Sequence, residues 1–156
     1  MNPEYLKKLH GLPLFAEFTE PELEGALDLI DKVKYPEGSC GVKQDEKGDC
    51  MFVLVEGSAR VVHRRHGKEI ELAVLKVGDF FGELALVDSG PRSADVEALT
   101  PCTLLRIEHG ALRAIAGVYP NAAFKLLIAV GRALVQRMRR GNQKYIDSLL
   151  PGNGEE

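Results

Sequence analysis

The sequence has no tryptophan, only three cysteines and no long uninterrupted hydrophobic run. The cysteines, Cys40, Cys50 and Cys102, are odd in number and never closer than ten residues, so they form neither a CxxC pair nor an obvious metal-binding set. No apolar run approaches the ~18 residues of a membrane-spanning helix, and no charged-then-apolar leader precedes the first predicted helix. We therefore expect a cytoplasmic chain with no membrane segment and no need of disulfides.

Motifs of catalysis are also missing. There is no Ser/His/Asp or Cys/His grouping, no pair of catalytic acids and no Walker loop, so nothing in the sequence predicts an enzyme. The net charge of −3 gives no general affinity for nucleic acid, although it is compatible with a local basic patch. His63 and His66 lie three residues apart near a predicted hairpin tip, and they point to opposite faces of a strand. We expect a solvated hairpin there, with no metal and no cofactor.

What is present is enough for one compact domain, because the chain has 156 residues and 45% hydrophobic content. Its middle part consists of short apolar segments separated by turn clusters about every ten residues, which predicts an antiparallel β-roll or jelly-roll barrel. The expected fold class is mainly β with flanking α-helices. The expected parts are a helical lead-in, a β-roll, C-terminal helices including one long helix, and a tail, over residues 1–31, 32–108, 109–150 and 151–156.

Local signals predict the individual elements. An N-cap residue followed by proline predicts a first helix that runs to about His10, and Thr19 with Glu22 fits a capping box at the start of a second helix. Alternation and turn signals predict strands at 51–55, 59–64, 69–75, 95–98 and 102–107.

One irregular segment interrupts the predicted β-roll, from Gly78 to Ala94, with the sequence GDFFGELALVDSGPRSA. After Gly82, the chain can form one or two helical turns whose first backbone N–H groups lack partners and attract phosphate. Arg92 follows a Gly-Pro turn and can fold back onto phosphate oxygens. Glu83 only accepts hydrogen bonds, so it suits a phosphate site only when the ligand also has hydroxyl donors, as a ribose does. Sugar and phosphate together predict a nucleotide.

Each of these residues also has a simpler interpretation. Glu83 can complement a helix N-terminus, and glycine-rich turns are common in β-proteins. Arg92 can pair with Asp88 or Asp95 instead of a ligand. The ordered combination of both charges with the small residues Gly82 and Ala85 favours the anion-binding interpretation.

GDFFGELAL followed by PRSA closely resembles the phosphate-binding cassette of the cyclic nucleotide-binding domain family. In that family, the helix from the Gly-Glu pair donates N–H groups to the cyclic phosphate, the Glu accepts the ribose 2′-hydroxyl and the Arg pairs with the phosphate. The resemblance implies a ligand-binding set made of Gly82, Glu83, Leu84, Ala85, Arg92, Ser93 and Ala94. It implies a cyclic purine nucleotide as ligand, with cyclic AMP expected over cyclic GMP because the chain resembles bacterial relatives.

A long helix is expected after Pro120, with no further proline until Pro151. Eight positions in it are separated by alternating steps of four and three residues, and six of them are apolar. These seam residues are Phe124, Ile128, Gly131, Val135, Met138, Asn142, Tyr145 and Leu149. The spacing predicts a homodimer along this helix. A helix packed only on its own domain is the alternative, since Gly131 and Gly141 weaken helix propensity.

Two residues beside the seam, Leu127 and Leu134, can face the barrel instead. Rough alignment with the family's base-capping segment suggests Leu134, Arg137 and Met138 as residues that contact the base. The basic residues of the helix suggest either DNA contact or a solvated flank. Only PGNGEE follows Leu150, so we expect no DNA-binding domain of the kind found in the bacterial catabolite activator proteins.

The expected function is a stand-alone sensor that binds a cyclic purine nucleotide. Its C-terminal helix is expected to order over the ligand and to pass the change to the dimer mate or to a separate effector protein. The alternative is a dimeric interaction module on the same fold that no longer binds nucleotide.

Overall fold

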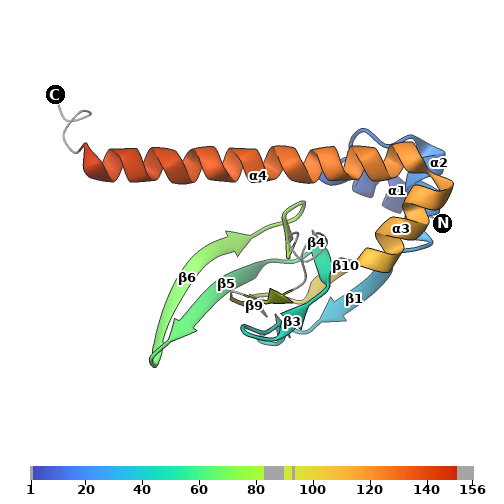
Figure 1. The fold of residues 1–156 in the computed structure, drawn as a ribbon. Helices are drawn as coiled ribbons and strands as arrows, with labels where there is room; N and C mark the ends of the chain where they lie inside the picture. Colours follow the sequence, from blue (N-terminus) through green and yellow to red (C-terminus); the bar gives the residue numbers. More distant parts are fainter. Residues whose placement is uncertain (1, 83–89, 93, 151–156) are drawn as a thin grey trace.

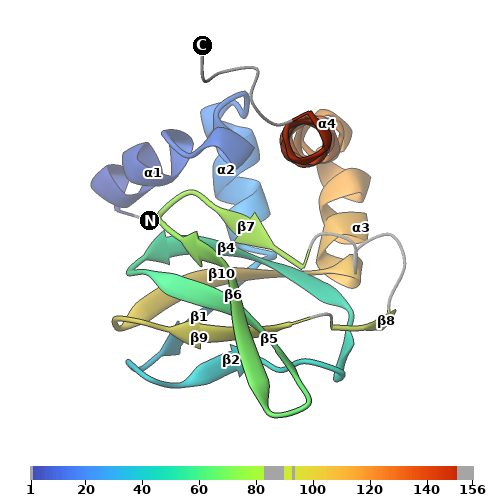
Figure 2. The same cartoon turned by 90° about the vertical axis from the view of Figure 1, so that its left-hand side faces the viewer.

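The structure is a computed structural model, and it describes residues 2–82, 90–92 and 94–150. Two antiparallel sheets form a β-roll, which is flanked by helices from both ends of the chain (Figures 1 and 2). The helices are α1 (Pro3–His10), the 3-10 turn η1 (Pro13–Phe15), α2 (Glu20–Leu27), α3 (His109–Val118) and α4 (Pro120–Leu149). The strands are β1 (Asp31–Tyr35), β2 (Cys40–Val42), β3 (Lys47–Gly48), β4 (Cys50–Glu56), β5 (Ala59–Arg65), β6 (Lys68–Leu75), β7 (Phe80–Phe81), β8 (Gly90–Pro91), β9 (Asp95–Ala98) and β10 (Cys102–Glu108). The predicted fold class is confirmed.

The N-terminal helices begin where their caps predict. The Asn2 side chain accepts a hydrogen bond of 2.9 Å from the backbone N–H of Glu4, which starts α1. At α2, the Thr19 hydroxyl accepts from the Glu22 N–H at 3.3 Å, and Glu22 Oε1 accepts from the Thr19 N–H at 2.9 Å. This reciprocal pair is the predicted capping box.

The strands are ordered β1-β10-β4-β7 in one sheet and β2-β9-β5-β6 in the other, and β3 pairs with β8. Strand β4 is buried on both faces, because its alternate residues serve two cores. Met51, Val53 and Val55 pack against the helices, whereas Phe52 and Leu54 point into the roll. All five predicted strands are present, and each end lies within one residue of the prediction. Strands β1 and β2 and the two-residue strands β3, β7 and β8 were not predicted.

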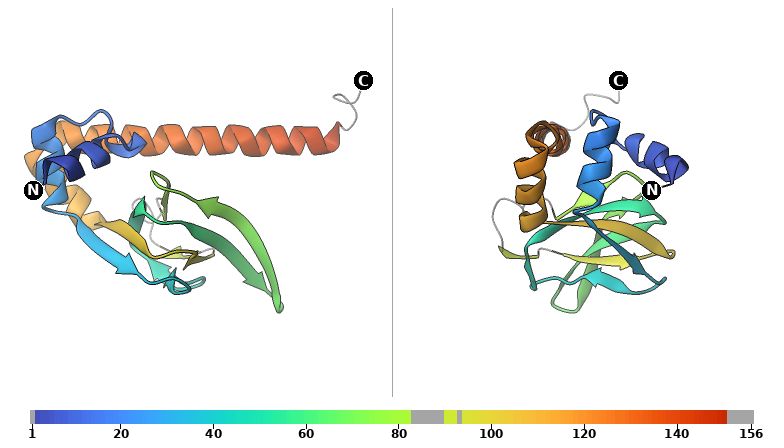
Figure 3. Two further views of the ribbon diagram at one scale, coloured as in Figure 1. Left: turned by 180° about the vertical axis from the view of Figure 1, so that it is seen from behind. Right: turned by 90° about the vertical axis from the view of Figure 1, so that its right-hand side faces the viewer.

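Helices α1 to α3 and the beginning of α4 gather at one end of the molecule, while the rest of α4 extends along the roll (Figures 1 and 3). The buried residues of α4 all lie near its start: Ala122, Ala123, Leu126 and Val130. Leu134 packs partly against the hydrophobic core between the helices and the roll, in line with the expectation that it can face the barrel. Leu127, for which the same was expected, is 46% exposed. Among the helices described, none combines the length and apolarity needed to cross a membrane.

The N-terminal end of α4 contacts α2 at two places. The Tyr119 ring, at the junction of α3 and α4, lies so close to Gly25 that a Cβ there would be 2.1 Å from the ring carbon Cε2. Lys125 Nζ lies 2.6 Å from Glu22 Oε1, the same oxygen that accepts from Thr19. The capping box of α2 therefore also anchors α4.

Candidate functional site

Arg92 follows β8, and its side chain lies against the edge of β4. Its Nη2 donates to the Cys50 carbonyl oxygen at 2.6 Å, and its Nη1 lies 3.5 Å from the Gly82 carbonyl oxygen. The guanidinium is also 6.0 Å from the centre of the Phe52 ring. No ion pair found between described residues includes Arg92. A half-buried cation that is held by carbonyl dipoles in this way is suited to binding an anion.

The alternative pairing of Arg92 with Asp95 is wrong, because Asp95 is used elsewhere. Its carboxylate forms an ion pair with Arg64 and accepts from the backbone N–H of Gln44. The other alternative partner, Asp88, lies outside the described residues.

Two glycines make room for the Arg92 side chain. A Cβ on Gly82 would lie 2.4 Å from Nη1 of Arg92, and a Cβ on Gly48 would lie 2.0 Å from its Nε. Gly82 also has φ of +76°, a left-handed conformation that glycine adopts without steric cost. The sequence predicted a role for Gly82 but missed Gly48. The only local signal for Gly48 is a turn just before a strand.

The thiol beside Arg92 stays neutral. Cys50 Sγ lies 3.7 Å from Nη2 of Arg92. Burial raises the pKa of the Cys50 thiol above its ordinary value, and the charge of Arg92 only partly opposes this shift. A neutral thiol does not form an ion pair with the guanidinium, so it does not compete with an anionic ligand.

An apolar pocket inside the roll is connected to Arg92 through two aromatic rings, Phe52 and Phe81. The Phe81 ring stacks on Phe52 with the ring centres 5.1 Å apart, and Phe81 also lines a pocket inside the roll. The residues that line this pocket are Tyr35, Gly41, Val42, Ala59, Phe81, Val96, Ala98, Cys102 and Leu104. The cation and the apolar pocket are thus separate features that the stacked Phe52 and Phe81 rings connect.

The structure brings together some of the predicted binding residues. Gly82 and Arg92 are in contact, and Ala94 is buried. The other predicted members, Glu83, Leu84, Ala85 and Ser93, lie outside the described residues. In the part of the chain that is described, no group of three or more acidic, histidine or cysteine side chains could hold a metal ion.

The three candidates on α4 have different surroundings. Arg137 Nη2 donates to the Phe80 carbonyl oxygen at 2.9 Å, and its guanidinium lies 4.9 Å from the centre of the Phe80 ring. Strand β7, which contains Phe80, leads directly into Gly82. Leu134 packs partly against the helical core, and Met138 is 67% exposed. Arg137 is thus the candidate that connects α4 to the segment carrying the site.

The family model for the cyclic nucleotide-binding domain matches residues 32–119. The cAMP-activated global transcriptional regulator CRP of Escherichia coli O157:H7 is 36% identical over 132 residues, which cover 83% of this chain and 63% of that protein. The chain therefore spans less than two thirds of the length of this curated relative.

Two solved structures are similar in fold and sequence. One is the N-terminal domain of a transcriptional regulator from Streptomyces coelicolor A3(2), with a TM-score of 0.72, 32% identity and coverage of 88% of this chain and 94% of that chain. The other is the catabolite activator protein of Thermus thermophilus, with a TM-score of 0.72, 30% identity and coverage of 88% and 62%. Because the family model also covers more than half of the sequence, this chain belongs to the cyclic nucleotide-binding domain family.

Proposed function

We propose that this chain is a sensor module that binds cyclic AMP, with Arg92 pairing with the cyclic phosphate. The observation that carries the proposal is the position of the Arg92 guanidinium, which is held by the carbonyl oxygens of Cys50 and Gly82 and has no carboxylate partner among the described residues. An anionic phosphate supplies the missing negative charge through charge-assisted hydrogen bonds.

The remaining roles in the cassette follow from the sequence. Glu83 accepts the ribose 2′-hydroxyl, and the backbone from Gly82 to Ala85 donates to the phosphate. Ser93 can donate to a phosphate oxygen or bond to a guanine amino group, so it does not select the base. The preference for adenine is supported by the relatives that are named cAMP-activated regulators.

We further propose that α4 transmits the binding event. A ligand shifts an equilibrium only through its different affinity for two states, so α4 must contact the ligand or the cassette differently in the two states. The contact between Arg137 and Phe80 supports this route, since it joins α4 to the strand before Gly82. The change then passes to a second copy of the chain or to a separate effector protein.

The test is isothermal titration of cyclic AMP and cyclic GMP into the wild type and into Arg92→Ala. We expect cyclic AMP to bind more tightly than cyclic GMP, and Arg92→Ala to weaken cyclic AMP binding about ten- to a hundredfold, because one or two charged hydrogen bonds are lost. The matched control is Arg113→Ala, since Arg113 is an exposed arginine on α3.

Three results would count against the proposal. Equal affinity of Arg92→Ala and wild type would remove Arg92 from the site. Tighter binding of cyclic GMP by tenfold or more would reverse the choice of base. Absence of binding by either nucleotide would favour the dimeric interaction module instead.

A further inference from the structure

The main chain of Arg92 is held by the loop between β2 and β3. The Asp45 N–H donates to the Arg92 carbonyl oxygen at 2.8 Å, and the Arg92 N–H donates to the Glu46 carbonyl oxygen at 2.8 Å. The antiparallel pairing of β3 with β8 continues this contact, since Lys47 and Gly48, which follow the loop, pair with Pro91 and Gly90, which precede Arg92. The loop at residues 43–46 therefore fixes the point from which the Arg92 side chain reaches into the site.

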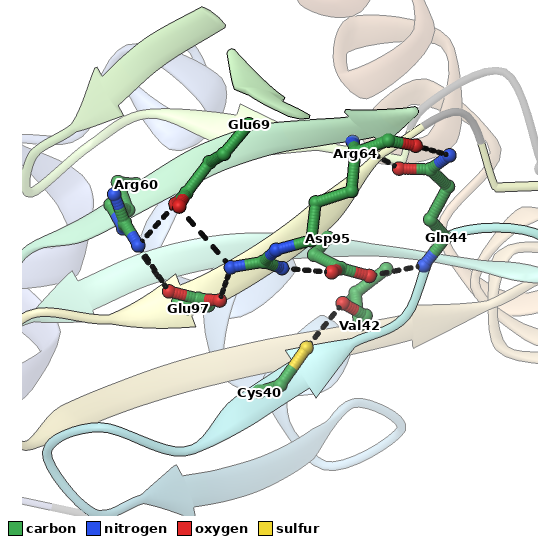
Figure 4. Close-up of polar contacts among 8 residues, drawn as sticks. All are labelled: Cys40, Val42, Gln44, Arg60, Arg64, Glu69, Asp95 and Glu97. Atoms are coloured by element: carbon green, nitrogen blue, oxygen red, sulfur yellow. Dashed lines mark hydrogen bonds and ion pairs between the residues drawn. The ribbon is translucent and has the colours of Figure 1, made fainter. Parts of the chain in front are cut away.

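Gln44 attaches that loop to β5. Its Nε2 donates to the Arg64 carbonyl oxygen at 2.9 Å, and its Oε1 accepts from the Arg64 N–H at 2.9 Å (Figure 4). The pairing of β9 with β5 ends at Asp95, and the Gln44 N–H donates to the Asp95 carboxylate at 2.6 Å. The carboxamide of Gln44 thus binds the main chain of β5 just beyond the last paired residue of β9, as another strand would.

Arg64, the residue of β5 that Gln44 contacts, also forms ion pairs through its side chain. The Arg64 guanidinium forms ion pairs with Asp95 and Glu97 and lies 3.4 Å from Glu69 (Figure 4). Hydrogen bonds from Arg64, and then from Arg60, hold the pKa of Glu97 below its ordinary value, so this carboxylate stays charged. Such a network fixes the geometry of β5 and β9 around Gln44.

We propose that Gln44 is a positioning residue for Arg92, an inference that rests on the proposed function. The loop contains Asp45 with φ of +70°, a left-handed conformation that is uncommon outside glycine although Asp tolerates it, and the contacts of Gln44 attach this turn to the sheet. Removing the Gln44 carboxamide frees the loop from β5. The Arg92 main chain then loses its fixed partners, and the guanidinium spends less time where the phosphate binds.

A double-mutant cycle tests this inference. Gln44→Ala in the wild type should weaken cyclic AMP binding about three- to tenfold, the effect of one or two lost hydrogen bonds. In the Arg92→Ala background, the same change should cost less than about twofold, because Gln44 acts through Arg92. Gln44→Met, which keeps the chain length but lacks the amide, should behave like Gln44→Ala. Lys43→Ala, an exposed neighbour in the same loop, is the control.

Equal losses in the two backgrounds would overturn the inference, because they would mean that Gln44 acts independently of Arg92. A second measurement needs no ligand. The Arg92 amide hydrogen, bonded to Glu46, should exchange with solvent faster in Gln44→Ala than in Lys43→Ala. Unchanged exchange would overturn the positioning role even if neither nucleotide binds, whereas failure of the Arg92→Ala titration alone would overturn only the proposed function.

Discussion

At the scale of single residues, the site depends on the absence of two side chains. The Arg92 guanidinium occupies the space that a Cβ would take at Gly48 and at Gly82. Only Gly82 also needs glycine for its backbone conformation. Gly48 lies in β3 without a left-handed φ, so its backbone conformation is compatible with a larger residue, and the atoms nearest to an added Cβ belong to Arg92.

We therefore predict that Gly48→Val folds but binds cyclic AMP about tenfold more weakly than the wild type. The branched side chain displaces the guanidinium and removes one or more of its charged hydrogen bonds. The measurement is titration of cyclic AMP, with thermal melting to check the fold. Lys47→Val, an exposed position in the same strand, is the control. If both variants bind like the wild type, the Arg92 guanidinium accommodates the valine side chain, and the prediction is wrong.

The sequence singles out Arg92 as a candidate but gives no signal for Gly48 and Gln44, which the structure connects to it. Arg92 is predictable because it follows a Gly-Pro turn within one recognisable segment. Gly48 and Gln44 belong to a different turn, and the only link is the pairing of β3 with β8 and the hydrogen bonds of the adjoining loop. Such contacts between distant segments leave no periodic pattern in a single sequence.

At the scale of elements, the docking of α4 on α2 depends on one carboxylate. Glu22 is buried, caps α2 and pairs with Lys125 on α4. The hydrogen bond from Lys125, followed by that from the Thr19 backbone, lowers the pKa of Glu22 below its ordinary value of 4.5. A lowered folded-state pKa means that this carboxylate stabilises the fold above pH 4.5, and that the contribution is lost as the pH falls through the folded-state pKa.

We predict that Glu22→Gln lowers the free energy of unfolding by about 1–3 kcal/mol at neutral pH, the usual effect of a charged hydrogen bond. Glutamine still completes the capping box, so the loss comes from the pair with Lys125. Chemical denaturation across a pH series measures it. The difference from the wild type should shrink as the pH falls below 4.5.

Glu24→Gln is the matched control, since Glu24 is an exposed glutamate on the same helix. A difference between wild type and Glu22→Gln that stays constant down to acid pH would mean that the charge of Glu22 does not anchor α4.

Most elements with clear local signals were predictable, whereas β1, β2 and the two-residue strands were not predicted. Thr19 with Glu22, and the alternating strands, carry their signals within a few residues. Strands β3, β7 and β8 have two residues each, too few for any alternation, and they exist because a partner strand lies beside them. The site lies among these short strands, which is why its frame was harder to predict than the rest of the roll.

At the scale of the whole molecule, α4 carries two apolar faces. One face is buried against the helical core near the start of α4. The sequence pattern alone did not distinguish this buried face from the seam. The six apolar seam residues are all exposed, by 40% to 67%. These residues are Phe124, Ile128, Val135, Met138, Tyr145 and Leu149. An apolar stripe of this length with coiled-coil spacing supports the proposal that a second copy covers it.

We predict that the wild type is a dimer, and that Val135→Glu combined with Met138→Glu is a folded monomer. The two carboxylates would be buried without partners in the seam. The free energy of burying them exceeds the free energy that the seam contacts contribute. Light scattering at micromolar concentration measures the mass. Gln136→Glu with Arg140→Glu, two exposed positions off the seam, is the control and should stay dimeric. A monomeric wild type would leave the dimer mate out of the proposed transmission route.

The joint at Tyr119 makes α4 a lever. At a rise of 1.5 Å per residue, its 30 residues span about 45 Å, and its buried contacts lie near one end. A tilt of only about 5° at the seat of Tyr119 on Gly25 would carry the far end of a rod of that length sideways by about 4 Å, roughly the width of a side chain. A displacement too small to disturb the core at Tyr119 would therefore decide which side chains meet near Leu149.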